Sequence, residues 1–146
     1  MTGRNVPVIG YTAGVFDMFH LGHLNLLRAA RARCDHLIVG VTTDELAEEV
    51  KGRRPVIPLR ERMEIVQSMR YVDSVVPQDS MDKLEAQHWL GFDRLFVGEN
   101  MQGPEWHRWE QLLGEVGVEV VFLPATLDSD GSLLDRSADD VREETP

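Results

Sequence analysis

The chain has 146 residues, of which 42% are hydrophobic, so it can bury one full core and is predicted to form a single domain. Its 25 acidic and 15 basic residues give a formal net charge of −10, which disfavours binding to nucleic acid or to an anionic membrane surface. No apolar run has the length of a membrane span, and residues 1–6 do not resemble a secretory signal, so we expect a cytoplasmic protein without membrane insertion.

The first half of the chain alternates between strand patterns and helical patterns. Residues 6–11 are apolar and β-branched, as in a buried strand, and apolar residues then recur at helical spacing. A later helix opens near a proline, which suits the first turn. The predicted elements are, in order, a strand at 6–11, a helix at 22–33, a strand at 36–42 and helices at 44–50 and 58–69.

The second half continues this alternation. It contains, in order, a strand at 74–77, a helix at 79–90, a strand at 93–98, a helix at 104–116 and a strand at 118–123. Strands separated by helices imply right-handed crossovers and a parallel sheet covered on both faces. We therefore predict an α/β fold, a Rossmann-like three-layer sandwich with a parallel five-stranded sheet. This domain is expected to span residues 1–134, followed at 135–146 by an acidic, partly disordered tail.

Basic residues gather in one short region, although the chain as a whole is acidic. They are Lys51, Arg53, Arg54, Arg60 and Arg62. Local potential governs binding in a cleft more than net charge does, so this region suits a small phosphorylated substrate. The alternative for the arginines is a solvated charged surface, and Arg62 could make a structural ion pair as easily as it could touch phosphate.

Residues 11–23, Tyr-Thr-Ala-Gly-Val-Phe-Asp-Met-Phe-His-Leu-Gly-His, carry the strongest functional signal. They begin where the first strand ends, at the edge of the sheet where α/β proteins bind ligands, and they end at a helix start, whose N–H groups attract anions. Gly22 lets the helix start pack tightly. His20 and His23 lie on one face and can both point at a phosphate. Ordinary surface histidines or a metal pair are the alternatives, and Asp17 could be a turn or capping residue.

Gly14–His23 resembles the signature of the cytidylyltransferase-like family, which includes the glycerol-3-phosphate, choline-phosphate and ethanolamine-phosphate cytidylyltransferases. The resemblance covers roughly residues 6–134. It continues at Thr43-Asp-Glu45, Lys51-Gly52, Glu61-Arg62 and Arg70-Tyr-Val-Asp73. It implies that the phosphate of a small phosphorylated alcohol attacks the α-phosphorus of CTP and that pyrophosphate leaves, without an enzyme-bound intermediate. It also favours a homodimer.

The resemblance implies roles for individual residues. His20, His23 and Lys51 match catalytic positions at the phosphates, and Lys51 and Lys83 match positions that contact the acceptor. We assign nucleotide binding to Val15, Phe16, Asp17, Gly22, Arg53, Arg62, Thr126 and Ser132. Mg²⁺ is expected to arrive with the triphosphate, because it retains waters and takes phosphate oxygens readily, so we assign it no protein ligands.

Two segments depart from the family pattern. Residues 98–103, followed by Glu105 and Trp106, suggest the glycerol-3-phosphate branch but keep only part of its motif; Trp106 and Trp109 belong either to the helix core or to the acceptor pocket. In the segment after the last strand, Ala125 stands where the family has an arginine. Thr126 and Ser132 keep hydroxyl groups that the family has in this segment.

The sequence is also compatible with two other functions. Residues 51–58, Lys-Gly-Arg-Arg-Pro-Val-Ile-Pro, also resemble a stretch of the heptose-phosphate adenylyltransferases, and the FMN-type adenylyltransferases share the histidine segment. Either resemblance implies that ATP is the donor. The altered segment after the last strand instead suits a nucleotide-binding protein that has lost turnover.

Overall fold

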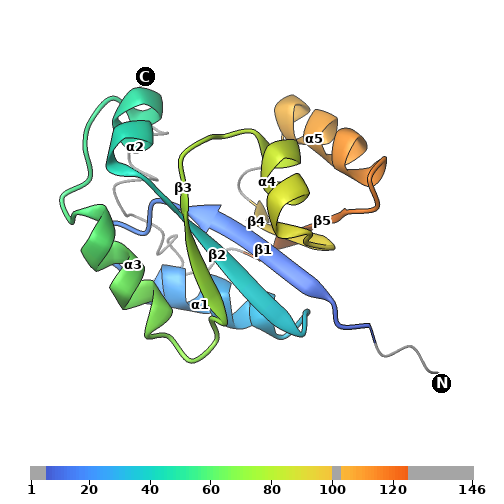
Figure 1. The fold of residues 1–146 in the computed structure, drawn as a ribbon, viewed down its shortest axis with the longest axis horizontal. Helices are drawn as coiled ribbons and strands as arrows, with labels where there is room; N and C mark the ends of the chain where they lie inside the picture. Colours follow the sequence, from blue (N-terminus) through green and yellow to red (C-terminus); the bar gives the residue numbers. More distant parts are fainter. Residues whose placement is uncertain (1–5, 100–102, 125–146) are drawn as a thin grey trace.

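The computed structural model describes residues 6–99 and 103–124, which form a parallel sheet flanked by helices (Figure 1). The strands are β1 (Ile9–Gly14), β2 (His36–Thr42), β3 (Ser74–Gln78), β4 (Arg94–Gly98) and β5 (Glu119–Leu123). The helices are α1 (Leu21–Arg31), α2 (Asp44–Lys51), α3 (Leu59–Gln67), α4 (Lys83–Leu90) and α5 (Pro104–Gly114). The predicted Rossmann-like fold with five parallel strands is confirmed.

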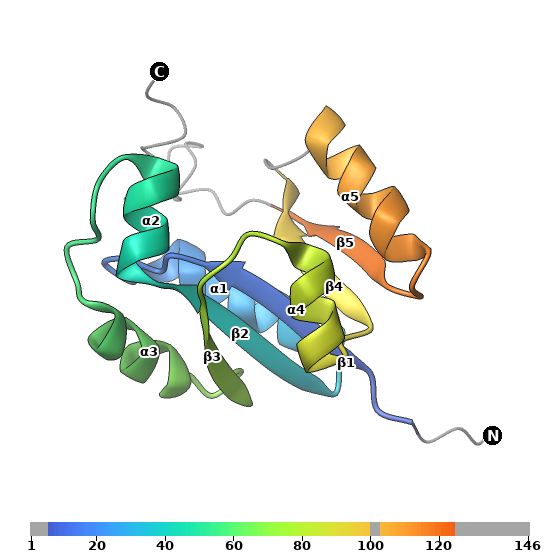
Figure 2. The ribbon, with the colours of Figure 1, turned by 45° about the horizontal axis from the view of Figure 1, so that its top comes forward.

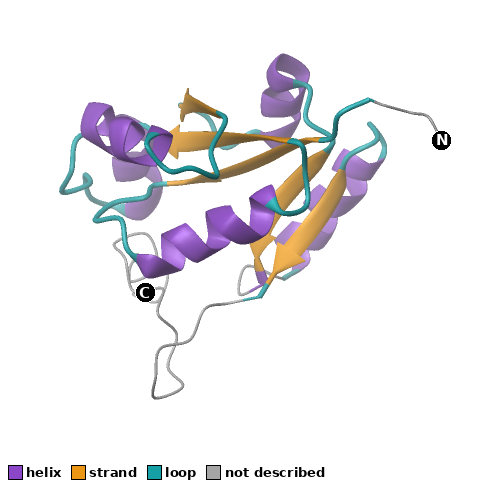
Figure 3. Ribbon diagram, turned by 90° about the horizontal axis from the view of Figure 1, so that it is seen from below, coloured by secondary structure: helices purple, strands orange, loops and turns teal. Residues whose placement is uncertain are grey.

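Each face of the sheet has its own hydrophobic core, because successive residues of a strand point to opposite faces. In β2, Leu37, Val39 and Val41 join the core beneath α1 and α3. Ile38, between them, joins a second core beneath α4 and α5. The helices accordingly lie on both sides of the sheet, which gives the three layers seen in Figure 3.

The strand order, β3-β2-β1-β4-β5, reverses direction between β1 and β4. β1 pairs with β2 along its whole length, from Ile9 to Gly14, but with β4 only at Gly10 and Tyr11. The pairing of β1 with β4 thus ends before the carboxyl end of either strand. Ligands of doubly wound sheets bind at such a reversal, outside the carboxyl ends of the strands.

Several element boundaries differ from the predicted ones for local reasons. The first strand begins at Ile9 and runs to Gly14, because Val6 is 80% exposed and the pairing with β2 begins only at Ile9. Helix α4 begins at Lys83 and not at residue 79, because the Asp82 side chain accepts hydrogen bonds from the backbone N–H groups of Leu84 and Glu85 and caps the helix. The strand predicted at 36–42 is found with the same bounds.

One tight contact explains a glycine inside the central strand β2. A Cβ atom at Gly40 would lie 2.1 Å from the Tyr11 hydroxyl oxygen, so only glycine fits beside this ring. Burial raises the pKa of Tyr11 to about 12.

Two sequence-based expectations concern the extent of the domain and the membrane. The predicted boundary between a domain and an acidic tail, at residues 134 and 135, lies outside the described residues. Within residues 6–99 and 103–124, none of the helices combines the length and the apolar character that crossing a membrane requires.

Candidate functional site

The segment between β1 and α1 holds a conformation that its residues adopt only under constraint. Phe16 and Met18 have φ angles of 54° and 50°, in the left-handed region. Such a conformation costs about 1–3 kcal/mol for each non-glycine residue, so surrounding contacts must stabilise it. Left-handed residues of this kind concentrate at functional sites, and the segment leads directly into the two signature histidines.

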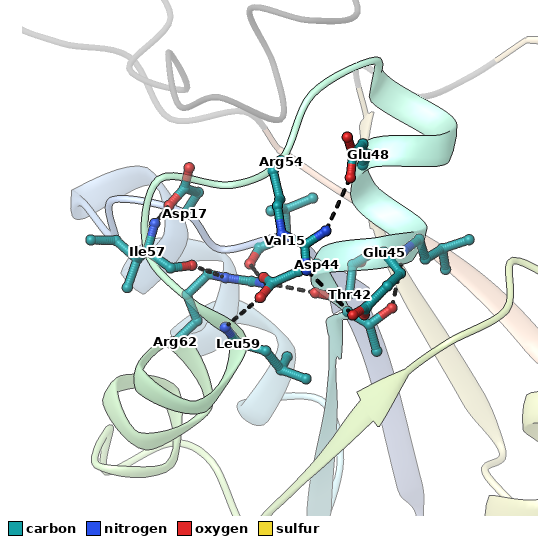
Figure 4. Close-up of polar contacts among 12 residues, drawn as sticks. Val15, Asp17, Thr42, Asp44, Glu45, Glu48, Arg54, Ile57, Leu59 and Arg62 are labelled. Carbon is teal, nitrogen blue, oxygen red and sulfur yellow. Dashed lines mark hydrogen bonds and ion pairs between the residues drawn. The ribbon is translucent and has the colours of Figure 1, made fainter.

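Asp17 supplies one of these contacts. Its side chain is fully buried, and its two carboxylate oxygens accept the backbone N–H groups of Val56 (2.8 Å) and Ile57 (2.9 Å) (Figure 4). The carboxylate therefore ties the β1–α1 segment to the segment between α2 and α3. This long-range structural role differs from the local turn or capping role considered for Asp17, and the nucleotide contact assigned to Asp17 stays a prediction.

Arg62, on α3, supplies further contacts to the segments around Asp17. Its side chain is buried, with 1% of the residue exposed. Its guanidinium donates hydrogen bonds of 2.7 Å to the carbonyl oxygens of Val15, Thr42 and Ile57 (Figure 4). It also forms an ion pair with Asp44, the first residue of α2. Arg62 thus joins three segments that follow β1, β2 and α2. The structural ion pair considered for Arg62 is present, and the nucleotide contact assigned to Arg62 stays a prediction.

The two histidines lie at the start of α1 and are oriented by backbone groups. His20 is the N-cap, and its Nδ1 accepts the N–H of Gly22 (3.0 Å), while Nδ1 of His23 accepts the N–H of His20 (3.2 Å). A neutral imidazole that accepts at Nδ1 carries its proton on Nε2, so these bonds assign the Nε2–H tautomer to both rings. The rings lie 4.1 Å apart between centroids.

The surroundings of the histidines favour an anion. α1 has no acidic residue in its first turn, so the positive end of the helix dipole is not neutralised there. His23 is buried, and its ring lies 5.3 Å from that of Phe16 and 5.2 Å from that of Phe19. Two rings that can donate from Nε2 and a set of helix N–H groups together form an arrangement suited to phosphate oxygens.

The basic residues between α2 and α3 differ in their surroundings. Lys51 is the half-buried last residue of α2, before Gly52, which caps the helix with a φ of 89°. Arg53 is exposed, whereas Arg54 forms ion pairs with Glu45 and Glu48 on α2. α2 follows the carboxyl end of β2, and Asp17 holds the segment after it. Lys51 and Arg53 are therefore at the same edge of the sheet as the histidines.

Lys83, at the start of α4, contacts two aromatic side chains. Its Nζ lies 5.2 Å from the ring centroid of Trp106 and 5.6 Å from that of Trp109, both on α5. Burial lowers the pKa of Lys83, and the carboxylates of Glu105 and Asp82 partly offset this effect. Both tryptophans also pack against the core beneath α4 and α5, so each takes part in the core and in the surroundings of Lys83.

The carboxyl edge of the sheet thus brings together most of the residues predicted from the sequence. They are Val15, Phe16, Gly22, His20, His23, Lys51, Arg53 and Lys83. Thr126 and Ser132 lie outside the described residues. Asp44 belongs to the Thr43-Asp-Glu45 segment of the family resemblance, but its ion pair with Arg62 was not predicted. In the described part of the chain, no three or more His, Cys, Asp or Glu side chains are grouped to hold a metal ion.

Comparison with known proteins agrees with this arrangement. Residues 11–144 match the cytidylyltransferase-like family, over most of the chain. The chain belongs to this family. The resemblance to this family seen in the sequence is confirmed.

Individual relatives of this cytidylyltransferase-like chain match only part of their own length. An ethanolamine-phosphate cytidylyltransferase from Arabidopsis thaliana is 43% identical over 96 residues, which are 61% of this chain and 23% of the relative. A bifunctional protein HldE from Granulibacter bethesdensis is 42% identical over 91 residues, 62% of this chain and 19% of the relative. The chain therefore spans less than a quarter of the length of either relative.

Solved structures share the fold. A lipopolysaccharide core biosynthesis protein from Thermoplasma volcanium superimposes with a TM-score of 0.71 at 21% identity, over 83% of this chain and 98% of that one. A pantoate-beta-alanine ligase from Francisella tularensis gives a TM-score of 0.64 at 14% identity, over 88% of this chain and 63% of that one. At these identities the likeness concerns the fold alone.

Proposed function

We propose that this chain transfers CMP from CTP to the phosphate of a small phosphorylated alcohol, such as glycerol-3-phosphate, and releases pyrophosphate. The observation that carries this proposal is the histidine pair, with both Nδ1 atoms accepting backbone N–H groups at the start of α1. In that tautomer each ring carries an Nε2–H group, which is a donor of the kind that binds phosphate oxygens. Membership of the cytidylyltransferase-like family and the ethanolamine-phosphate cytidylyltransferase relative support CTP as the donor.

The reaction is a direct displacement. A phosphate oxygen of the acceptor forms a bond to the α-phosphorus of CTP, and the bond from that phosphorus to the bridging oxygen of pyrophosphate breaks. The leaving pyrophosphate keeps the electron pair, so no proton transfer is needed to balance the step. Catalysis then consists of positioning and charge stabilisation. His20 and His23 would donate Nε2–H to the triphosphate, and Lys51 would neutralise charge between the transferred and acceptor phosphates.

The remaining proposed contacts follow from the carboxyl edge of the sheet. The backbone of Phe16 and Gly22, with Arg53, would contact the nucleotide, as would Thr126 and Ser132. The carbonyl of Val15 already accepts from Arg62, so a nucleotide contact there falls to its other backbone atoms. Lys83 would contact the acceptor. Asp17 and Arg62 would act as positioning residues, because they hold the segments that carry the contacting groups.

Mg²⁺ would enter with the triphosphate. We propose that the ion is held mainly by phosphate oxygens and water, because Mg²⁺ retains waters and takes phosphate oxygens readily. When bound, it supplies neutralisation of the triphosphate charge. As in the sequence-based expectation, the active protein is proposed to be a homodimer.

The experiment that tests this function measures pyrophosphate release from CTP and from ATP with a panel of phosphorylated alcohols. We expect release with CTP that depends on the acceptor. An absence of release with every donor and acceptor would show that the chain does not carry the activity.

Adenylyl transfer from ATP is the second candidate. Two observations favour it: the resemblance of residues 51–58 to heptose-phosphate adenylyltransferases and the HldE relative. Thermal unfolding in the presence of each nucleotide separates the two candidates, because a ligand that binds only the folded state raises the unfolding temperature. We expect CTP to raise it more than ATP at equal concentration, and the opposite order would favour adenylyl transfer.

A further inference from the structure

The first turns of α4 and α5 form an aromatic site around Lys83. α4 follows the carboxyl end of β3 and α5 follows that of β4, so both helices begin at the edge of the sheet where the histidines lie (Figure 2). Lys83 is the first residue of α4, and Trp106 and Trp109 lie in the first half of α5. The aromatic pair beside Lys83 therefore belongs to a helix that begins at the same edge of the sheet as the helix start that carries the histidines.

The arrangement of these three side chains is the one by which proteins recognise cationic ligands, but here the cation belongs to the chain. The Lys83 ammonium lies within 6 Å of both indole centroids, the range of a cation–π interaction. Nζ also donates to the carbonyl oxygen of Met81, 3.3 Å away. A second cation at the same faces would displace this lysine or meet its charge at close range.

We propose that Lys83 makes this site selective for acceptors whose alcohol part carries oxygen atoms and no positive charge, so that polyol phosphates are used and aminoalcohol phosphates are rejected. This inference rests on the proposed function and narrows its substrate class. An ammonium has three N–H donors, of which one serves Met81. The others would donate to hydroxyl or carboxylate oxygens of the acceptor, whereas an ammonium group of an acceptor offers only donors.

The test compares two acceptors of equal length. One is 2-hydroxyethyl phosphate, which ends in a hydroxyl group, and the other is ethanolamine phosphate, which ends in an ammonium group. Pyrophosphate release from CTP is measured for each. We expect kcat/KM to favour the hydroxyl compound by about tenfold or more, the size of one strong cation–π or charge interaction. Equal use of the two, or a preference for ethanolamine phosphate, would overturn the proposal.

The Lys83→Met variant tests whether the lysine causes the preference. Because burial disfavours the charged lysine, a neutral side chain of similar length is expected to fold at least as stably. In this variant the ratio of kcat/KM for 2-hydroxyethyl phosphate to that for ethanolamine phosphate should fall by about tenfold, mainly because KM for ethanolamine phosphate is lower. The control Arg108→Met removes an exposed charge from α5 and should leave the ratio unchanged. An unchanged ratio in Lys83→Met would assign the preference to other residues and overturn the proposal.

Fluorescence provides a readout that does not depend on turnover. In a Trp89→Phe background, the remaining tryptophans are Trp106 and Trp109, both beside Lys83. Choline is then titrated. We expect it to quench the Lys83→Met protein and to leave the protein with Lys83 unaffected, and equal quenching would show that the lysine does not occupy the aromatic faces. An absence of pyrophosphate release with all acceptors would contradict the proposed function. The choline titration would still show whether Lys83 occupies the ring faces of the two tryptophans.

Discussion

At the scale of single residues, the structure separates groups proposed to contact the substrate from groups that hold the surrounding segments together. The histidine pair and its helix start could be predicted, because both lie within one short motif. The long-range partners of Asp17 and Arg62 could not be predicted. Asp17 bonds to Val56 and Ile57, which are 39 and 40 residues away in the sequence, and Arg62 bonds to Val15, which is 47 residues away. A local pattern shows that an aspartate or arginine is present, but only the folded chain shows what it contacts.

The role of His20 as a cap can be separated from its role as a donor. Asparagine caps helices well but has no group at the position of Nε2, so His20→Asn should keep the stability within about 0.5 kcal/mol. The same variant should lower kcat about a hundredfold or more, because one charge-stabilising donor is lost. Steady-state kinetics and denaturant unfolding measure the two effects. Normal turnover with His20→Asn would exclude a catalytic role for this imidazole.

Arg62 is expected to matter chiefly for stability. Arg62→Met leaves Asp44 and three carbonyl oxygens without their donor, so unfolding should require about 3–5 kcal/mol less free energy. Arg60, exposed on the same helix, is the matched control, and Arg60→Met should change stability by less than about 0.5 kcal/mol. Urea unfolding of both variants checks this difference, and equal effects would contradict the role assigned to Arg62.

At the scale of elements, strand and helix identities followed from the sequence, whereas several boundaries did not. The predicted first strand was placed too early because apolar character alone does not show where a partner strand begins. The start of α4 was also placed too early, although Asp82 is a recognisable capping residue. Boundaries depend on pairing and capping, which a hydrophobic pattern reports only indirectly.

The segment between α2 and α3 should depend on Asp17 for its order. The N–H groups of Val56 and Ile57 donate to this carboxylate, so both are expected to exchange slowly with solvent deuterium. In Asp17→Ala they should exchange markedly faster, while the amides of β2 keep their protection. Unchanged protection at both positions in the variant would show that other contacts hold the segment.

At the scale of the whole molecule, the alternation of strands and helices predicted a parallel α/β sandwich, and the structure confirms it. The strand order β3-β2-β1-β4-β5 was not predicted, because it depends on which strands pair across long stretches of sequence. That order places the reversal between β1 and β4, beside the histidine segment. The approach of α4 and α5, which brings Lys83 to two tryptophans, was equally hidden from the sequence.

The most direct test of nucleotidyl transfer follows the α-phosphorus itself. The protein is incubated with CTP labelled at that phosphorus and with 2-hydroxyethyl phosphate or glycerol-3-phosphate, and the products are separated. Direct displacement predicts that the label moves into a CDP-alcohol in equal amount to the pyrophosphate released, and that none is retained on the protein. Label that remains in CTP, or that becomes covalently attached to the protein, would contradict the proposed reaction.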